Sequence, residues 1–144
     1  MRGRAVVPGE ARGSALVSDE PLSFWGGYDW RTGEITDRRH PLSGQVAAGR
    51  VLCLPATRGS STTTAVLLEA VRAGTAPAAI VSPGVDLFLA LASVVAGELY
   101  GRPLPLVALD PGDFRQLRSG DRVAVGSDGS VSVDRATAVP RGPA

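Results

Sequence analysis

The feature that most constrains the fold is an alternation of apolar strands and helices after residue 50. Short apolar runs at 51–54, 78–81 and 104–109 are typical of buried strands, and the segments at about 62–73 and 86–100 have apolar residues at helical spacing. Strands joined by helical connections of this length pair in parallel. The sequence therefore predicts an α/β domain whose central parallel sheet has flanking helices.

The two ends of the chain are predicted to add further β-structure to this centre. Additional strands are expected at 4–7, 15–18, 122–126 and 130–134. The last two form a hairpin across Asp128-Gly129, a dipeptide that favours tight turns. Residues 135–144 are expected to be a flexible tail, so we predict one domain over residues 1–134 with β-hairpins added to the α/β centre.

Composition excludes several classes of function. A length of 144 residues suits one domain, and a formal net charge of +1 favours neither nucleic acid nor an anionic membrane surface as a partner. No apolar run approaches the roughly 18 residues of a membrane-spanning helix. The N-terminus leads into a predicted strand rather than a signal-peptide core. We therefore expect a cytoplasmic protein that binds neither membrane nor nucleic acid.

The single cysteine and single histidine argue against a metal centre built by this chain alone. Cys53 lies within a predicted strand and is expected to be buried and unreactive. One Cys and one His cannot complete a closed zinc site or hold an iron–sulfur cluster, so metal chemistry would need ligands from another chain. His40 precedes Pro41, and both a structural and a catalytic role remain open for it.

Five consecutive hydroxyl residues, Ser60 to Thr64, follow Arg58-Gly59 where a strand gives way to a helix. The free N–H groups of a helix N-terminus favour anions, so a serine there is either an N-cap or a reactive hydroxyl. The loop lacks the lysine of a P-loop and the Gly-x-Ser-x-Gly of a nucleophile elbow. Arg58 suits a carboxylate or phosphate clamp, or is an ordinary loop residue. Asp86, by contrast, is expected only to cap the second helix.

Residues 23–30 combine both tryptophans with Gly26-Gly27 and have neither helical nor strand periodicity. They belong to a long irregular stretch, 19–49, and long ordered loops often have functional roles. Either the aromatic residues form a buried cluster at one end of the sheet, or Ser23 and Trp25 help to line a pocket or a docking surface. The glycine pair would let a ligand or another backbone approach closely.

Several of these segments, taken in order, resemble the small subunit of aconitase X, the swivelling domain of that family. They are PLSFWGG (21–27), TG (32–33), HPLSG (40–44), RGSST (58–62) and GTAPAAI (74–80), within a likeness from about residue 3 to 134. The resemblance implies a swivelling β/β/α fold. It also implies hydro-lyase activity in a heterodimer with a large aconitase-X subunit.

The resemblance further implies a division of labour between the subunits. The large subunit supplies cysteines for an iron–sulfur cluster or iron, which acts as a Lewis acid on the departing hydroxyl, and this chain binds no metal itself. The small subunit supplies a serine base, which in the aconitases outside the X family is the first serine of a Gly-x-Gly-Ser-Ser-Arg-Glu loop. Residues 57–63 match that loop, so the base falls on Ser60. A helix N-terminus would stabilise its alkoxide.

The loop departs from the pattern of the aconitases outside the X family at two positions. Thr57 stands where those enzymes have the first glycine, and Thr62 stands where they have the arginine that clamps the substrate carboxylate. The clamp must then come from Arg58, from backbone N–H groups, or from the partner. The residues expected to bind the substrate are Arg58, Gly59, Ser61, Ser23, Trp25, Gly26 and Gly27.

The substrate expected from the resemblance is cis-3-hydroxy-L-proline, dehydrated to 1-pyrroline-2-carboxylate. Bacterial members of the family resemble dehydratases of that compound, whereas archaeal members dehydrate mevalonate 5-phosphate. All 15 basic residues are Arg, which is typical of a GC-rich and bacterial genome. Three alternatives remain open: a phosphomevalonate dehydratase small subunit, a non-catalytic binding or assembly module, and a free-standing binder that uses the Ser/Thr loop as an anion site.

Overall fold

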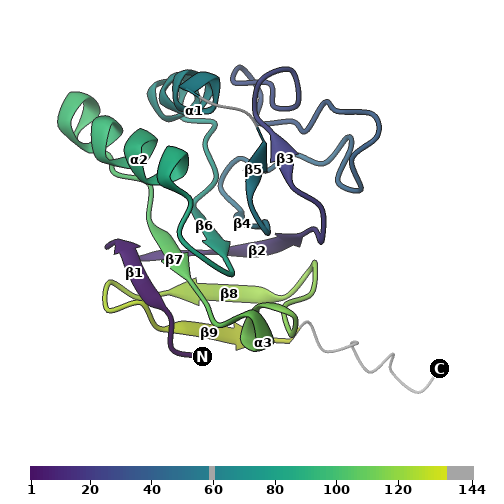
Figure 1. Cartoon of the computed structure of the whole chain (residues 1–144), viewed down its shortest axis with the longest axis vertical. Coiled ribbons are helices and arrows are strands. Elements are labelled where there is room, and N and C mark those ends of the chain that lie inside the picture. The colour runs from purple at the N-terminus through teal and green to yellow at the C-terminus, as the bar shows by residue number, and fades with distance from the viewer. Residues whose placement is uncertain (59–60, 136–144) are drawn as a thin grey trace.

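A seven-stranded sheet that curls on itself forms the centre of the molecule (Figure 1). The structure is a computed structural model and describes residues 1–58 and 61–135. The strands, in the order in which they lie in the sheet, are β1 (Arg4–Val7), β7 (Leu106–Ala108), β6 (Ala79–Ser82), β4 (Val51–Cys53), β2 (Ala11–Val17), β8 (Arg122–Val125) and β9 (Val131–Asp134).

The four central strands run parallel, as the alternation of strands and helices predicts. β4 pairs with β2 on one side and with β6 on the other, and β6 pairs with β7. Helix α1 (Ser61–Ala73) lies between β4 and β6 in the sequence, and α2 (Leu87–Tyr100) connects β6 to β7. A short helix, α3 (Pro111–Phe114), follows β7. The predicted order of strands and helices and the α/β class are confirmed, with small shifts in the ends of the elements.

The outer strands are antiparallel and bring the two edges of the sheet together. β1 pairs with β7, and the predicted hairpin is confirmed as β8 and β9. At the seam the Gly3 N–H donates to the Gly129 carbonyl at 2.8 Å, and Arg2 bridges to Ser130. Gly129 has a φ of +88°, and a Cβ there would lie 2.6 Å from the Gly3 carbonyl oxygen. Glycine is therefore required where the edges meet.

β2 is longer than predicted because it serves two neighbours. Its first half, from Ala11 to Ser14, pairs antiparallel with β8, and its second half pairs parallel with β4. The first half reads Ala-Arg-Gly-Ser and is only partly buried, so it lacks the apolar alternation that reveals a strand in a sequence. The predicted strand, which starts at Ala15, therefore includes only the buried second half of β2.

The central strands bury side chains on both faces of the sheet. Toward α1 and α2 they present Leu16, Leu52, Ile80 and Leu106, and on the opposite face Ala15, Cys53, Val81 and Val107. Both helices lie over the same face (Figure 1). The strands β8 and β9 and helix α3 close the other face with Phe114, Val123 and Val131. Burial on both faces explains why these strands read as continuous apolar runs.

Cys53 is fully buried in this arrangement, and burial raises the pKa of its thiol to about 12, with the charge of Asp121 adding to the rise. A thiol with a pKa above the solution pH stays protonated and is a poor nucleophile. At pH 8 we expect no reaction of the folded protein with an aromatic disulfide reagent, and stoichiometric reaction in denaturant. Absorbance at the wavelength of the released thiolate measures both, and rapid labelling of the folded chain would contradict the assigned burial.

Candidate functional site

A small two-stranded parallel sheet joins the aromatic segment to the hydroxyl loop. β3 (Leu22–Ser23) pairs with β5 (Thr57–Arg58), so that Leu22 lies opposite Thr57 and Ser23 lies opposite Arg58. Figure 1 shows these strands side by side below the N-terminal region of α1. Two segments that are distant in the sequence therefore meet directly before Gly59, and the pairing brings two predicted site residues together.

The predicted base, Ser60, and Gly59 lie outside the described residues. The described chain stops with Arg58 at the end of β5 and continues with Ser61 as the first residue of α1, a helix of 13 residues. The hydroxyl residues that follow differ in environment: Thr62 is exposed, whereas Thr63 is fully buried. The run of hydroxyls thus includes at least one side chain that packs inside the protein.

Asp86 links this loop to α2 through both of its carboxylate oxygens. Oδ1 accepts hydrogen bonds from the backbone N–H groups of Phe88 and Leu89 at 3.0 and 3.2 Å, which confirms the predicted N-cap. Oδ2 accepts from the backbone N–H and the hydroxyl of Thr57 at 2.9 and 2.6 Å. One side chain therefore holds the start of α2 and the strand that enters the hydroxyl loop.

Sequence analysis missed this second function of Asp86. The signal that it left unused was the hydroxyl of Thr57, directly before Arg58. A buried or half-buried carboxylate is stabilised by charge-assisted hydrogen bonds of this kind. Thr57 is thus coupled to the start of α2.

The aromatic segment divides between the core and the surface. Phe24 and Tyr28 are buried with their ring centroids 5.1 Å apart, and the Tyr28 hydroxyl donates to the Thr75 carbonyl at 2.7 Å. Burial raises the pKa of Tyr28, so its hydroxyl stays protonated as that donor. Trp25, between them, is 70% exposed. The buried-cluster interpretation therefore applies to Phe24 and Tyr28, and a surface interpretation applies to Trp25.

The glycine pair has two different environments. A Cβ on Gly27 would lie 2.1 Å from the carbonyl oxygen of Ser23, so the turn of the chain itself requires glycine there. Gly26 has a φ of +75° and no atom within 4 Å of the position of a Cβ. The hydroxyl of Ser23 donates to the Trp25 carbonyl at 3.1 Å and closes the same turn. Of the two glycines, only Gly26 therefore leaves room beside the turn for a ligand or another backbone to approach.

Arg58 also lines a charged hollow of about 370 Å³. Its walls are formed by Glu20, Pro21, Asp37, Arg39, His40 and Arg58. Both arginines are exposed, and neither is within ion-pair distance of a carboxylate in the part of the chain that the structure describes. Guanidinium groups bind carboxylates and phosphates in forked geometry. The structure thus adds Arg39, from the irregular stretch, to the anion-binding candidates.

His40 lines this hollow and is itself buried, and both of its ring nitrogens have contacts. Nδ1 accepts a hydrogen bond from the Leu42 N–H at 3.1 Å, so a neutral ring carries its proton on Nε2. Nε2 lies 3.3 Å from the Glu20 carbonyl oxygen, which accepts a hydrogen bond from the Nε2–H, and 3.5 Å from the Ser18 hydroxyl. The ring therefore ties two parts of the irregular stretch together, and the geometry supports a structural role.

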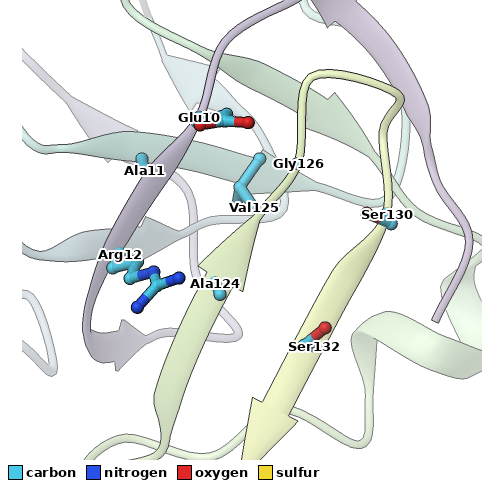
Figure 2. A pocket seen from close by; sticks show the side chains of 8 residues that line it. All are labelled: Glu10, Ala11, Arg12, Ala124, Val125, Gly126, Ser130 and Ser132. Carbon is cyan, nitrogen blue, oxygen red and sulfur yellow. The ribbon is translucent and has the colours of Figure 1, made fainter.

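A second hollow, of about 430 Å³, lies elsewhere on the surface (Figure 2). It is formed by Glu10, Ala11, Arg12, Ala124, Val125, Gly126, Ser130 and Ser132. These residues lie in β2, β8 and β9 or directly beside the ends of these strands, and none of the predicted site residues is among them. The candidate site is therefore the region around β3, β5 and the start of α1.

Two kinds of feature are absent from residues 1–58 and 61–135. No three His, Cys, Asp or Glu side chains among these residues come together as a metal site. A stretch of helix both long enough and apolar enough to cross a membrane is also absent from this part of the chain.

Comparison with known proteins decides the family. A family model described as the aconitase X swivel domain matches residues 1–133. The chain belongs to this family. Its curled sheet with two helices on one face is accordingly the swivelling β/β/α fold that the resemblance implies, and the crystal structure of Thermococcus kodakaraensis aconitase X in its holo-form superposes with a TM-score of 0.81 at 33% identity. That match covers 92% of this chain and 95% of the other.

Curated relatives of this swivel domain fall into two groups that differ in length. The chain is 50% identical over 106 residues to the cis-3-hydroxy-L-proline dehydratase of Pseudomonas aeruginosa, covering 74% of this chain but only 18% of that protein. It is 38% identical over 135 residues to the phosphomevalonate dehydratase small subunit of Thermococcus onnurineus, covering 93% of this chain and 98% of that protein. The chain thus spans about a fifth of the first relative and nearly all of the second.

The two roles of Asp86 in this swivel domain can be separated by substitution. Asp86→Ala removes the N-cap and both bonds to Thr57, whereas Asp86→Ser keeps a capping hydroxyl that is too short to reach Thr57 as well. We expect Asp86→Ala to lower the free energy of unfolding by about 1–3 kcal/mol and Asp86→Ser to lower it by less. Urea unfolding measures both changes. The Thr57 amide should exchange with solvent faster in both variants, and unchanged exchange would contradict the assigned contact.

Proposed function

We propose that this swivel domain acts as the small subunit of an aconitase-X-type hydro-lyase that is active only together with a large subunit. The observation that carries the proposal is the family match over residues 1–133, joined to the alignment with nearly the whole of proteins named phosphomevalonate dehydratase small subunit. The surroundings of the loop support a split site. The loop leads from β5 to the N-terminus of α1. The one thiol of the chain is buried in the sheet, so it is not free to bind a metal at this loop.

In this proposal Ser60 is the base. It follows β5 and directly precedes α1, where the free N–H groups and partial positive charge at the start of a 13-residue helix favour an alkoxide. Ser60 removes the proton on the carbon α to the substrate carboxylate. The electron pair of that C–H bond forms a C=C bond, and the hydroxyl on the neighbouring carbon leaves as hydroxide. The proton taken by Ser60 then passes to that hydroxide, which gives water and restores the alkoxide. With cis-3-hydroxy-L-proline the resulting enamine tautomerises to 1-pyrroline-2-carboxylate.

Arg58 orients the substrate carboxylate in this proposal, together with Ser61 and the backbone N–H of Gly59. Arg58 lies beside Ser23 in the β3–β5 pair and shares the charged hollow with Arg39, which we add as a second cation for the same anion. The exposed indole of Trp25 and the glycine turn, Gly26-Gly27, line the pocket or the seam with the large subunit.

The iron–sulfur or iron centre belongs to the large subunit in this proposal. Cys53 and His40 are the only thiol and imidazole of the chain, and both are committed to packing or hydrogen bonds. The side chains of the described residues form no cluster of ligands that could hold an iron–sulfur cluster or an iron ion. The proton transfer assigned to Ser60 is therefore the chemical step that falls to this chain.

Sequence identity favours cis-3-hydroxy-L-proline as the substrate. The chain is 50% identical to the Pseudomonas aeruginosa dehydratase named for that compound and 38% identical to the Thermococcus onnurineus small subunit named for phosphomevalonate. Mevalonate 5-phosphate is the second candidate because the pair of arginines in the charged hollow also suits a phosphate.

The experiment that tests the proposal is co-expression with the large aconitase-X subunit of the same genome, followed by purification under argon. We expect a complex that contains iron and dehydrates cis-3-hydroxy-L-proline faster than mevalonate 5-phosphate, while neither chain is active alone. The reverse preference would reassign the substrate. A chain that forms no complex and shows no activity would leave the binding or assembly module as the better account.

A single hydroxyl substitution tests the base. In the complex, Ser60→Ala should lower kcat by a factor of about 10²–10⁴, the usual contribution of a general base, while thermal stability and subunit association stay close to wild type. Thr62→Ala is the matched control, since it removes an exposed hydroxyl from the same run and should leave kcat within about twofold. Comparable activity of Ser60→Ala and Thr62→Ala would refute the assignment of Ser60.

A further inference from the structure

Helix α2 exposes a large apolar surface. Leu87 is 76% exposed, Leu91 51% and Val94 54%, and Phe88 and Leu99 are exposed beside them. The spacing of these residues places them on one side of the helix, because positions three and four apart share a face. We call this set of five residues the α2 apolar face. Its only charged neighbour within α2 is Glu98.

The inner side of α2 shows the opposite of the usual amphipathic pattern. The buried residues of the helix are Leu89, Ala92, Ser93 and Ala96. Apart from Leu89, the side chains that face the sheet are therefore small, and larger aliphatic and aromatic side chains point away from it. A helix that meets only water normally places charged and polar residues outward, so this arrangement indicates a surface built for contact.

Helix α1 provides an internal comparison on the same face of the sheet. Its outer side has an ion pair between Arg72 and Glu69, with an N–O distance of 2.7 Å and both side chains substantially exposed. Thr62 and Ala65 are exposed on the same helix. The two neighbouring helices differ in their outer surfaces, and contiguous apolar exposure of the kind seen on α2 marks sites of protein association.

The α2 apolar face begins beside the candidate active site. Its first residue, Leu87, directly follows Asp86, whose carboxylate holds Thr57 in the strand that leads to Ser60. A protein that covers this face therefore also lies against the loop that has to meet the second half of a split site.

We infer that the α2 apolar face is the docking surface for the large aconitase-X subunit. This inference rests on the proposed function and adds to it the place where the subunits meet. In the Pseudomonas aeruginosa relative the matched region is 18% of the protein, so more than four-fifths of that chain lies outside the region that matches this swivel domain. The large subunit would correspond to that remaining part of the relative. We choose it as the occupant because the α2 apolar face lies beside the loop that has to meet the other half of the active site. A second copy of this chain would instead pair two identical half-sites.

Competitive assembly in the full complex tests the inference. The large subunit is co-expressed with equal amounts of wild-type and variant small chains that have different tags, and the ratio of the two in the purified complex is measured. Leu87→Glu with Leu91→Lys places a favourable i, i+4 ion pair on α2 and leaves net charge unchanged, so the helix is kept while its face becomes polar. Val94→Lys, which lies four residues before Glu98, is a second and milder variant.

A matched control on α1 exchanges the exposed ion pair, as Glu69→Arg with Arg72→Glu, and also leaves net charge unchanged. We expect the α2 double variant to be depleted at least 30-fold from the complex, the Val94→Lys chain to be depleted less, and the α1 variant to compete equally with wild type. Circular dichroism and thermal melting of each isolated chain show that the variants are folded.

Each other outcome has one meaning. Equal incorporation of folded α2 variants overturns the docking surface but leaves the proposed function standing. Failure of the wild-type chain to assemble with the large subunit overturns the proposed function and this inference with it. A wild-type chain that is dimeric in light scattering and becomes monomeric on substitution of α2, with unchanged incorporation into the complex, assigns the face to a second copy and also overturns the inference.

Discussion

Burial of the central strands on both faces is the constraint on which the rest of the structure depends. β4 and β6 have no polar face, so the sheet must be covered twice. Helices α1 and α2 cover one side. The other side is covered by the sheet itself, which curls until Gly3 and Gly129 meet at the seam and enclose the second apolar cluster. Cys53 lies in that cluster, which removes the thiol from chemistry.

This architecture also places the candidate site. Parallel strands direct their carboxyl ends toward one edge of the sheet, and the connection from β4 to α1 leaves that edge through β5 and the hydroxyl loop. The loop is held from two sides: β3 pairs with β5, and Asp86 binds Thr57 while it caps α2. The loop, the charged hollow and the α2 apolar face are therefore coupled through a few hydrogen bonds.

The sequence predicted the strands and helices that have a periodic pattern, but it did not predict the contacts of the irregular segments. The strand–helix alternation, the Asp128-Gly129 hairpin and the cap at Asp86 follow from local periodicity and local backbone chemistry. The pairing of β3 with β5 joins segments far apart in the chain and involves two residues each, which is too short for a periodic signal. The division of the aromatic segment was also beyond the sequence, because Phe24 and Trp25 are adjacent and differ only in which side of the turn they occupy.

The sequence by itself determined the class of the fold, the family, the burial of Cys53 and the candidate loop, since each depends on residue type and spacing along the chain. Only the tertiary structure decided which distant groups meet. Arg39 and Arg58 line the same hollow, and both ring nitrogens of His40 have hydrogen-bond partners. Asp86 binds Thr57 in addition to capping α2. The tertiary structure also left the large side chains of α2 on the outside, because the positions of α1 and the sheet, rather than the hydrophobicity of α2, decide which of its faces is covered.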